Sequence, residues 1–196
     1  MLAYVLSGLG LSASSGLNAY LPLLILALAD RFSTIIELRD QFDVLSSPWV
    51  ILALLLVLPL ELILDKIPRV DVLSDRIHMG LRIAAGAIAM MAVTGQSNGF
   101  HPLLGAVLGA GIAGVAHVIK ARARPAVTRA TAGIANPFVS MVEDFAVVIV
   151  SVTACLLPYG VVLALPIFAI SLWRLYSRMS STPVRIGSLV LPHTKS

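Results

Sequence analysis

Residues 137–157 read PFVSMVEDFAVVIVSVTACLL, an apolar run in which Glu143 and Asp144 are the only charged side chains. About 20 apolar residues are enough for a helix to cross the hydrocarbon core of a bilayer. The stretch is therefore predicted to be a membrane span. Ionisable groups at membrane depth are costly and mark either function or a buried partner. The same stretch thus indicates both the class of fold and a first candidate site.

The composition of the whole chain agrees with this prediction. Of the 196 residues, 58% are hydrophobic and only 12% are charged, and the mean hydropathy is +0.95. Soluble domains carry roughly 25% charged residues, and disordered chains are rich in charge and poor in apolar residues. We therefore expect an all-α, polytopic transmembrane bundle. The predicted spans are residues 2–29, 49–64, 83–93, 102–119, 137–157 and 159–175.

Six spans divide into two sets of three that enter the membrane in opposite senses. Such a division is typical of an inverted repeat. We therefore predict a single transmembrane domain, residues 1–178, that contains two repeats, residues 1–95 and 100–178. Small residues and occasional acids that recur by chance are the alternative explanation. Residues 179–196, which contain prolines and a glycine, are predicted to be a flexible cytoplasmic tail.

The basic residues predict an orientation. With six spans, twelve of the 14 Lys and Arg side chains fall on one side, and only Arg31 and Arg39 fall on the other. Cytoplasmic loops accumulate such residues, so both termini are expected in the cytoplasm. The net charge of +4 is explained in the same way, and no nucleic-acid partner is expected. Trp49, Trp173 and Tyr176 are expected at the membrane interfaces.

Two pairs of acids are candidate sites for an ion or a substrate. Glu61 and Asp65 share one helical face, although Asp65 with Lys66 also fits an interfacial cap. Adjacent acids such as Glu143 and Asp144 cannot both ionise cheaply in a low dielectric. Either one is protonated, or Lys120, Arg122 or a bound cation neutralises them. A packing salt bridge, a cation or proton site and an exposed interfacial position all remain open.

Other polar residues extend this candidate site. Asn136, Ser140 and Glu143 form one stripe along a helix. His117 and Lys120 lie one turn apart, and His117 is either a packing residue or a ligand that faces Glu143.

The first span contains weak helix formers. Ser12, Ser14, Ser15 and Gly16 are followed by Asn18, which predicts a broken helix; a continuous helix with a seam of small residues is the alternative. Broken helices at membrane depth need protein or water to satisfy their backbone and often mark substrate sites. Asn18 and Tyr20 are therefore candidate substrate contacts.

Residues 68–82 predict an amphipathic helix on the cytoplasmic surface. Its polar face carries Asp71, Asp75, His78 and Arg82, which form either a gate or partner surface or a solvated face.

Two further features are read as packing. The glycines at 105, 109, 111 and 114 would allow another helix to approach closely. Cys155, the single cysteine, should pack as a small apolar residue, since no Cys/His cluster or cofactor motif accompanies it.

Four motifs carry a resemblance to a known family. They are GLNAYLP from Gly16, ELILDKIPRVD from Glu61, HVIK from His117, and Asn136-Pro followed by Ser140 and Glu143-Asp144. Together they resemble the bacterial membrane family catalogued as domain of unknown function 4126, over about residues 5 to 175. The resemblance implies a polytopic protein of the bacterial inner membrane without an assigned substrate. The acids also resemble the Glu-x-Gly-Asp-Lys motif of cation/proton exchangers, but Glu61 and Asp65 are one residue further apart and the glycine is missing.

The leading hypothesis is a small transporter or channel that moves a cation or a small solute, or couples to protons, through the intramembrane acids. The alternative is a non-catalytic scaffold that has structural acid–base pairs and binds lipid or a partner. Under either hypothesis the chain could form a homo-oligomer. No enzyme signature is present, and an intramembrane enzyme acting on a lipid-linked substrate is the third hypothesis.

Overall fold

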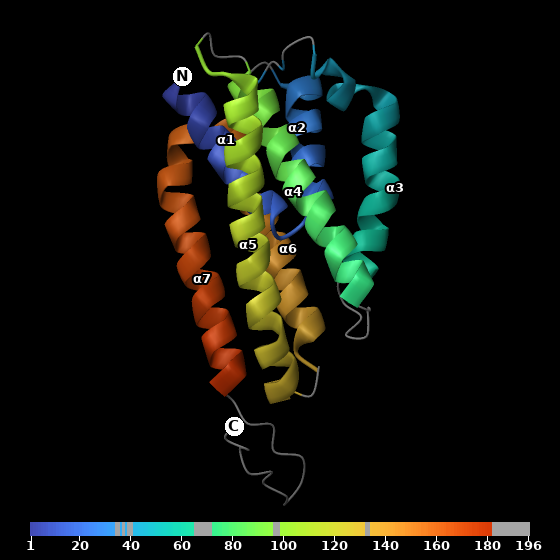
Figure 1. Ribbon diagram of the computed structural model, residues 1–196, viewed down its shortest axis with the longest axis vertical. Helices are drawn as coiled ribbons and strands as arrows, with labels where there is room; N and C mark the ends of the chain where they lie inside the picture. The colour runs from blue at the N-terminus through green and yellow to red at the C-terminus, as the bar shows by residue number, and fades with distance from the viewer. Residues whose placement is uncertain are drawn as a thin grey trace, which may run out of the picture.

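The computed structural model describes residues 1–33, 36, 38, 41–64, 72–95, 99–131 and 134–181, and in these ranges the fold is all-α (Figure 1). Two short 3-10 turns, η1 (Asp43–Ser46) and η2 (Pro158–Gly160), accompany seven α-helices. The helices are α1 (Leu2–Ser15), α2 (Tyr20–Phe32), α3 (Pro48–Leu64), α4 (Val72–Thr94), α5 (Pro102–Thr131), α6 (Asn136–Leu156) and α7 (Val161–Ser181).

Length and composition make this a multi-pass membrane protein. Among the described residues, three segments are long and apolar enough to cross a bilayer: Pro102–Thr131, Asn136–Leu156 and Pro158–Arg178. Three shorter apolar helices accompany them: Leu2–Ser15, Pro48–Leu62 and His78–Thr94. The prediction of a polytopic helical bundle is thereby confirmed, whereas the inverted repeat stays a prediction.

The first apolar stretch does not run straight through the bundle. α1 and α2 form a V whose open ends lie at the upper end of the bundle, as drawn in Figure 1. A Cβ added at Gly10 would meet Ala154 and Val161, where α6 ends and α7 begins, whereas one at Gly16 would meet Ala113 in the middle of α5. The break between the two helices is confirmed. The prediction that residues 2–29 form one span is wrong, because the chain turns back at this break.

The hairpin also changes the placement of the termini. The end of α2 lies beside the start of α3, where the Arg31 guanidinium donates to the Ser46 carbonyl oxygen at 3.1 Å. The N-terminus therefore lies at the upper end of the bundle, and α7 ends at the lower end (Figure 1). The N-terminus and the end of α7 are thus at opposite ends of the described bundle, and the expectation that both termini lie in the cytoplasm stays a prediction. Residues 182–196 of the predicted tail lie outside the described residues.

Two predicted cytoplasmic segments are parts of longer helices. α4 runs without interruption from Val72 to Thr94, so the part of the expected surface helix that the structure describes is its first turns. At the end of this segment the exposure is the reverse of that expected, because Arg82 is buried and Leu81 is exposed. Likewise, α5 continues through the basic stretch to Thr131, where the Thr131 hydroxyl donates to the Val127 carbonyl at 2.8 Å.

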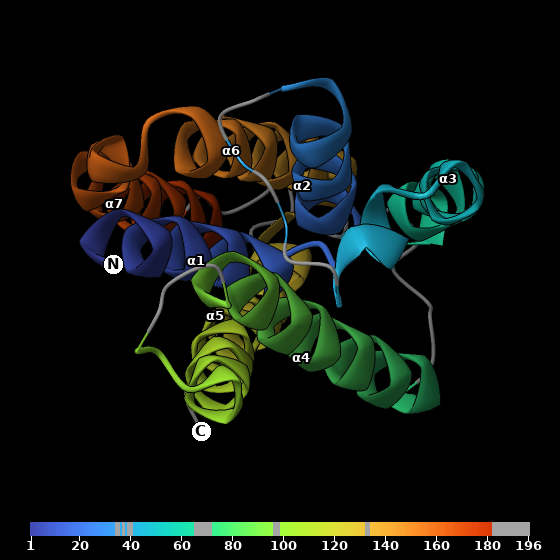
Figure 2. The ribbon, with the colours of Figure 1, turned by 90° about the horizontal axis from the view of Figure 1, so that it is seen from above.

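The glycines of α5 form an internal seam with α4. These two helices cross closely in both views (Figures 1 and 2), and Gly86 of α4 faces Gly109 of α5. A Cβ at Gly109 would clash with the Gly86 carbonyl oxygen and lie 2.6 Å from the Met90 Cβ, whereas one at Gly111 would meet nothing within 4 Å. Cys155 packs in the apolar core, as expected.

Gly109→Ala is expected to lower the free energy of unfolding by about 1–3 kcal/mol, because the added methyl group overpacks the seam. Gly111→Ala is the matched control. Its methyl group meets open space, so a change from neutral to a gain of about 1 kcal/mol is expected from helix propensity. Thermal unfolding of the purified protein in detergent measures both variants. Equal shifts in Tm would contradict the assignment of the seam.

Candidate functional site

The polar residues of the bundle gather around the tip of the α1–α2 hairpin, which comprises residues 16–19. Serines and Gly16 end α1, and the Leu17 and Asn18 backbone N–H groups donate to the Ser14 carbonyl at 3.0 and 3.1 Å. The Asn18 side-chain oxygen then accepts from the backbone N–H groups of Tyr20 and Leu21, at 3.1 and 3.0 Å. Asn18 thus starts α2 by satisfying amide groups that the helix leaves open.

The first cluster at the tip, the Glu143 group, comprises Lys120, Arg124, Glu143 and Tyr176. The Lys120 Nζ lies 3.1 Å and the Arg124 Nη2 lies 2.6 Å from the Glu143 Oε2. The Tyr176 hydroxyl donates to the other oxygen, Glu143 Oε1. The Glu143 side chain is fully buried, and its partners come from α5 and α7.

The second cluster, the Glu61 group, comprises Glu61, Arg82 and His117 from α3, α4 and α5. The Glu61 Oε1 accepts from the Ala19 backbone N–H and lies 3.4 Å from the Arg82 Nη2. The Arg82 Nη1 lies 3.3 Å from the His117 Nδ1. All three side chains are buried. The Glu61 Oε2 has no hydrogen-bond partner among the described residues.

The hairpin tip contacts both clusters directly. The Lys120 Nζ donates to the Leu17 carbonyl at 2.8 Å, next to the C-terminal end of α1. The Asn18 Nδ2 donates to the Asp144 Oδ1 at 3.2 Å. The Ala19 N–H, at the start of α2, faces Glu61. A cation thus meets the negative end of one half-helix and an anion meets the positive end of the other, as the helix dipoles favour.

The charges of this site balance. Three acids (Glu61, Glu143 and Asp144) and three cations (Arg82, Lys120 and Arg124) lie at the site; Glu61 and Glu143 contact the cations, and Asp144 accepts from the Asn18 amide. The described residues contain no group of three or more His, Cys, Asp or Glu side chains that could hold a metal ion. With neutral His117, the site is therefore self-neutralised, and any positive cargo would have to replace one of the protein's own cations.

Six of the predicted site residues meet at the tip: Asn18, Glu61, His117, Lys120, Glu143 and Asp144. Tyr20 reaches it through its backbone N–H. Ser140 is buried on the same face of α6 as Glu143. Asn136 instead bonds Thr128, with its Nδ2 2.9 Å from the threonine hydroxyl, near the connection between α5 and α6.

The predicted gate residues have mixed outcomes. Arg82 belongs to the Glu61 group rather than to a surface face, because its guanidinium is drawn inward by a buried carboxylate. His78 is half-buried on α4. Asp65 and Asp71 lie outside the described residues, and of Asp75 the structure describes only the backbone in α4.

Two members of the site were missed by sequence reasoning. Arg124, not the exposed Arg122, neutralises Glu143 together with Lys120. The i, i+4 spacing of Lys120 and Arg124 places them on one helical face and could have indicated this. Tyr176 was expected at an interface but is buried against Glu143. No local pattern distinguishes it from an interfacial tyrosine.

Fold and site together define a class of protein: a helical membrane protein with a broken, re-entering helix pair and a charged, buried centre. Within that class, the chain belongs to the family described as domain of unknown function DUF4126, whose match covers residues 5–178. No curated protein and no solved structure matches the chain.

Proposed function

We propose that this protein is a small membrane transporter or channel that moves a cation, or couples to protons, through the charged groups at the hairpin tip. The observation that carries the proposal is the break itself. Two half-helices meet inside the bundle, and their open backbone groups contact Lys120, Glu61 and, through Asn18, Asp144. Discontinuous helices of this kind form substrate and ion sites in transporters.

The charge balance suggests how such a site would work. Glu143 cannot lose Lys120 or Arg124 in a buried site without another positive charge to replace it. A proton or a cargo cation that reaches Glu143 would compete with these side chains and release the hairpin tip. The Glu61 Oε2, which lacks a partner among the described residues, offers a second acceptor.

An orientation and a location follow from the same proposal. The described Lys and Arg side chains of α5 and α7 lie in the lower half of the bundle, whereas Arg31 is at the upper end. The positive-inside rule would then place the lower end, with the end of α7, in the cytoplasm and the N-terminus outside. By the family resemblance, the membrane would be the inner membrane of a bacterium.

Proteoliposome flux is the test. Purified protein would be examined with pH-sensitive and cation-sensitive dyes across a panel of ions. We expect flux from the wild type, near-complete loss in Glu143→Gln/Asp144→Asn, and wild-type flux from Arg122→Gln, an exposed arginine on α5 that serves as the control. Absence of flux for every ion in folded wild-type protein would contradict a cation or proton role.

A scaffold is the second candidate, and one specific observation favours it. Both oxygens of Glu143 already have partners from the protein, as expected for a salt bridge that fixes helix packing. Under this alternative the charged centre is structural, and lipid or a partner protein would bind elsewhere. It predicts that variants with balanced charge keep every property of the wild type.

A further inference from the structure

A groove of about 410 Å³ lies between α6 and α7. Its walls include Val142, Ala146 and Ile149 of α6 and Ala164, Ile167 and Phe168 of α7. Ser171 supplies the one side-chain hydroxyl among the lining residues. The volume is in the range of small-molecule sites, about 300–1,000 Å³, and the lining suits a hydrocarbon ligand.

Both walls of the groove belong to segments that can cross a bilayer. Leu163 and Ile167 are largely exposed on the outer side of α7, and Phe145 is exposed on α6. In a membrane these side chains meet lipid tails, so the groove opens toward lipid rather than water. Small residues, Ala146 and Ala164, keep it from being filled by the protein's own side chains.

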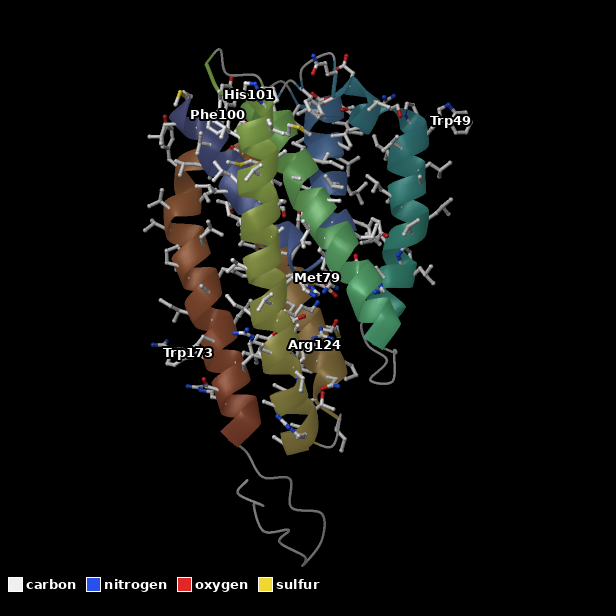
Figure 3. The ribbon with its side chains drawn as sticks, in the orientation of Figure 1. Trp49, Met79, Phe100, His101, Arg124 and Trp173 are labelled. Atoms are coloured by element: carbon white, nitrogen blue, oxygen red, sulfur yellow. The ribbon has the colours of Figure 1, made fainter. Side chains whose placement is uncertain are left out.

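The groove leads to positive charge. Ile167 and Ser171 line it, and Arg174 and Arg178 continue the same stripe of α7 at successive three- and four-residue steps. Arg174 is exposed. Trp173, beside it, is also exposed and projects from the lower part of α7 away from the bundle (Figure 3). Exposed Trp and Arg side chains at a span end are typical of the headgroup level.

We propose that this groove is a binding site for one anionic phospholipid, with an acyl chain between α6 and α7 and the phosphate at Arg174. The apolar walls select a lipid tail, and the guanidinium selects a phosphate-bearing, negatively charged headgroup. No residue of the two charged clusters is among the residues that line the groove, so the lipid site does not depend on the proposed transport.

Fluorescence of a tryptophan in the groove provides the test. The chain has two tryptophans, so Trp49→Phe and Trp173→Phe remove the native signal, and Phe168→Trp places the sole reporter on the wall of the groove. The protein would be placed in phosphatidylcholine vesicles that contain either brominated phosphatidylglycerol or brominated phosphatidylcholine as the minor component. We expect a preference of about fivefold for the brominated phosphatidylglycerol, the fold-change that one interfacial arginine supplies.

Two variants locate the site. In the same background, Arg174→Gln should remove the preference, whereas Arg122→Gln, which removes the same charge outside the groove, should keep it. Ala164→Phe should fill the groove and weaken quenching by the brominated phosphatidylglycerol; Ala146→Phe fills it from the other wall if the first variant does not fold.

Equal quenching by both lipids would overturn the proposal. So would a preference that survives the filling variants. A groove reporter that neither lipid quenches, together with crosslinking between copies, would show that a second copy covers the groove instead and would equally overturn the proposal.

Discussion

Glu143→Gln is expected to lower the free energy of unfolding by about 3–5 kcal/mol, since it leaves the buried Lys120 and the partly buried Arg124 without their shared anion. Lys120 and Arg124 both contact the Glu143 Oε2. Glutamine keeps the shape of the side chain and an acceptor for the Tyr176 hydroxyl, so the loss reports the charge rather than the packing. Thermal or denaturant unfolding of the purified protein in detergent would measure it.

A second substitution should restore most of this loss. Arg124→Gln together with Glu143→Gln returns the site to charge balance and retains the bond from Lys120 to the Leu17 carbonyl. Arg124 is also the more exposed of the two partners, with 21% of its side chain accessible against 4% for Lys120. A double variant no more stable than Glu143→Gln alone would show that charge balance is not what the site requires.

In a wild type that shows flux, the same pair of variants separates a transport role of Glu143 from a packing role. Loss of the buried anion destabilises the fold whether the site transports or only packs, so stability alone does not distinguish them. The balanced double variant removes this ambiguity. If it is stable but shows no flux, Glu143 has a role in transport; if it regains flux with stability, the carboxylate is structural.

Features that depend on neighbouring residues could be predicted from the sequence, whereas features that depend on contacts between distant helices could not. Residues 137–157 are apolar enough to identify α6, and the cost of a buried charge identifies Glu143 as a residue with partners. The helix break at Gly16 is visible because weak helix formers precede Asn18. Hydropathy and helix propensity are properties of a short segment, so they can be read from its residues alone.

The direction of the chain after the break is not local. A broken span and a re-entering hairpin have the same composition, and what distinguishes them is the set of partners that satisfies the tip. Those partners, Glu61 and Lys120, come from helices more than forty residues away in the sequence. The positive-inside count treated residues 2–29 as one crossing, so it could not indicate that the N-terminus and the end of α7 lie at opposite ends of the bundle. Tyr176 was missed because its partner, Glu143, also belongs to another helix, 33 residues away in the sequence.

Lys120→Met is expected to loosen the hairpin tip itself. The Lys120 Nζ is the atom that joins the Leu17 carbonyl to Glu143, and its side chain is almost fully buried. Its removal leaves a buried carbonyl without its donor and a carboxylate with one cation fewer, which together should cost about 3 kcal/mol. Arg122→Met, two residues along α5 and exposed, should change stability by no more than about 0.5 kcal/mol.

Hydrogen–deuterium exchange would show which part of the chain is destabilised by Lys120→Met. Lys120→Met should speed exchange of the backbone amides of residues 17–21, because the hairpin tip loses its bond to α5. Arg124→Gln keeps that bond, so it should leave these amides as slow as in the wild type while lowering stability through Glu143. If both variants speed exchange equally along the whole chain, the tip has no independent motion. A site whose tip cannot open separately from the bundle could not release a cargo there, and the structural alternative would then account better for the charged centre.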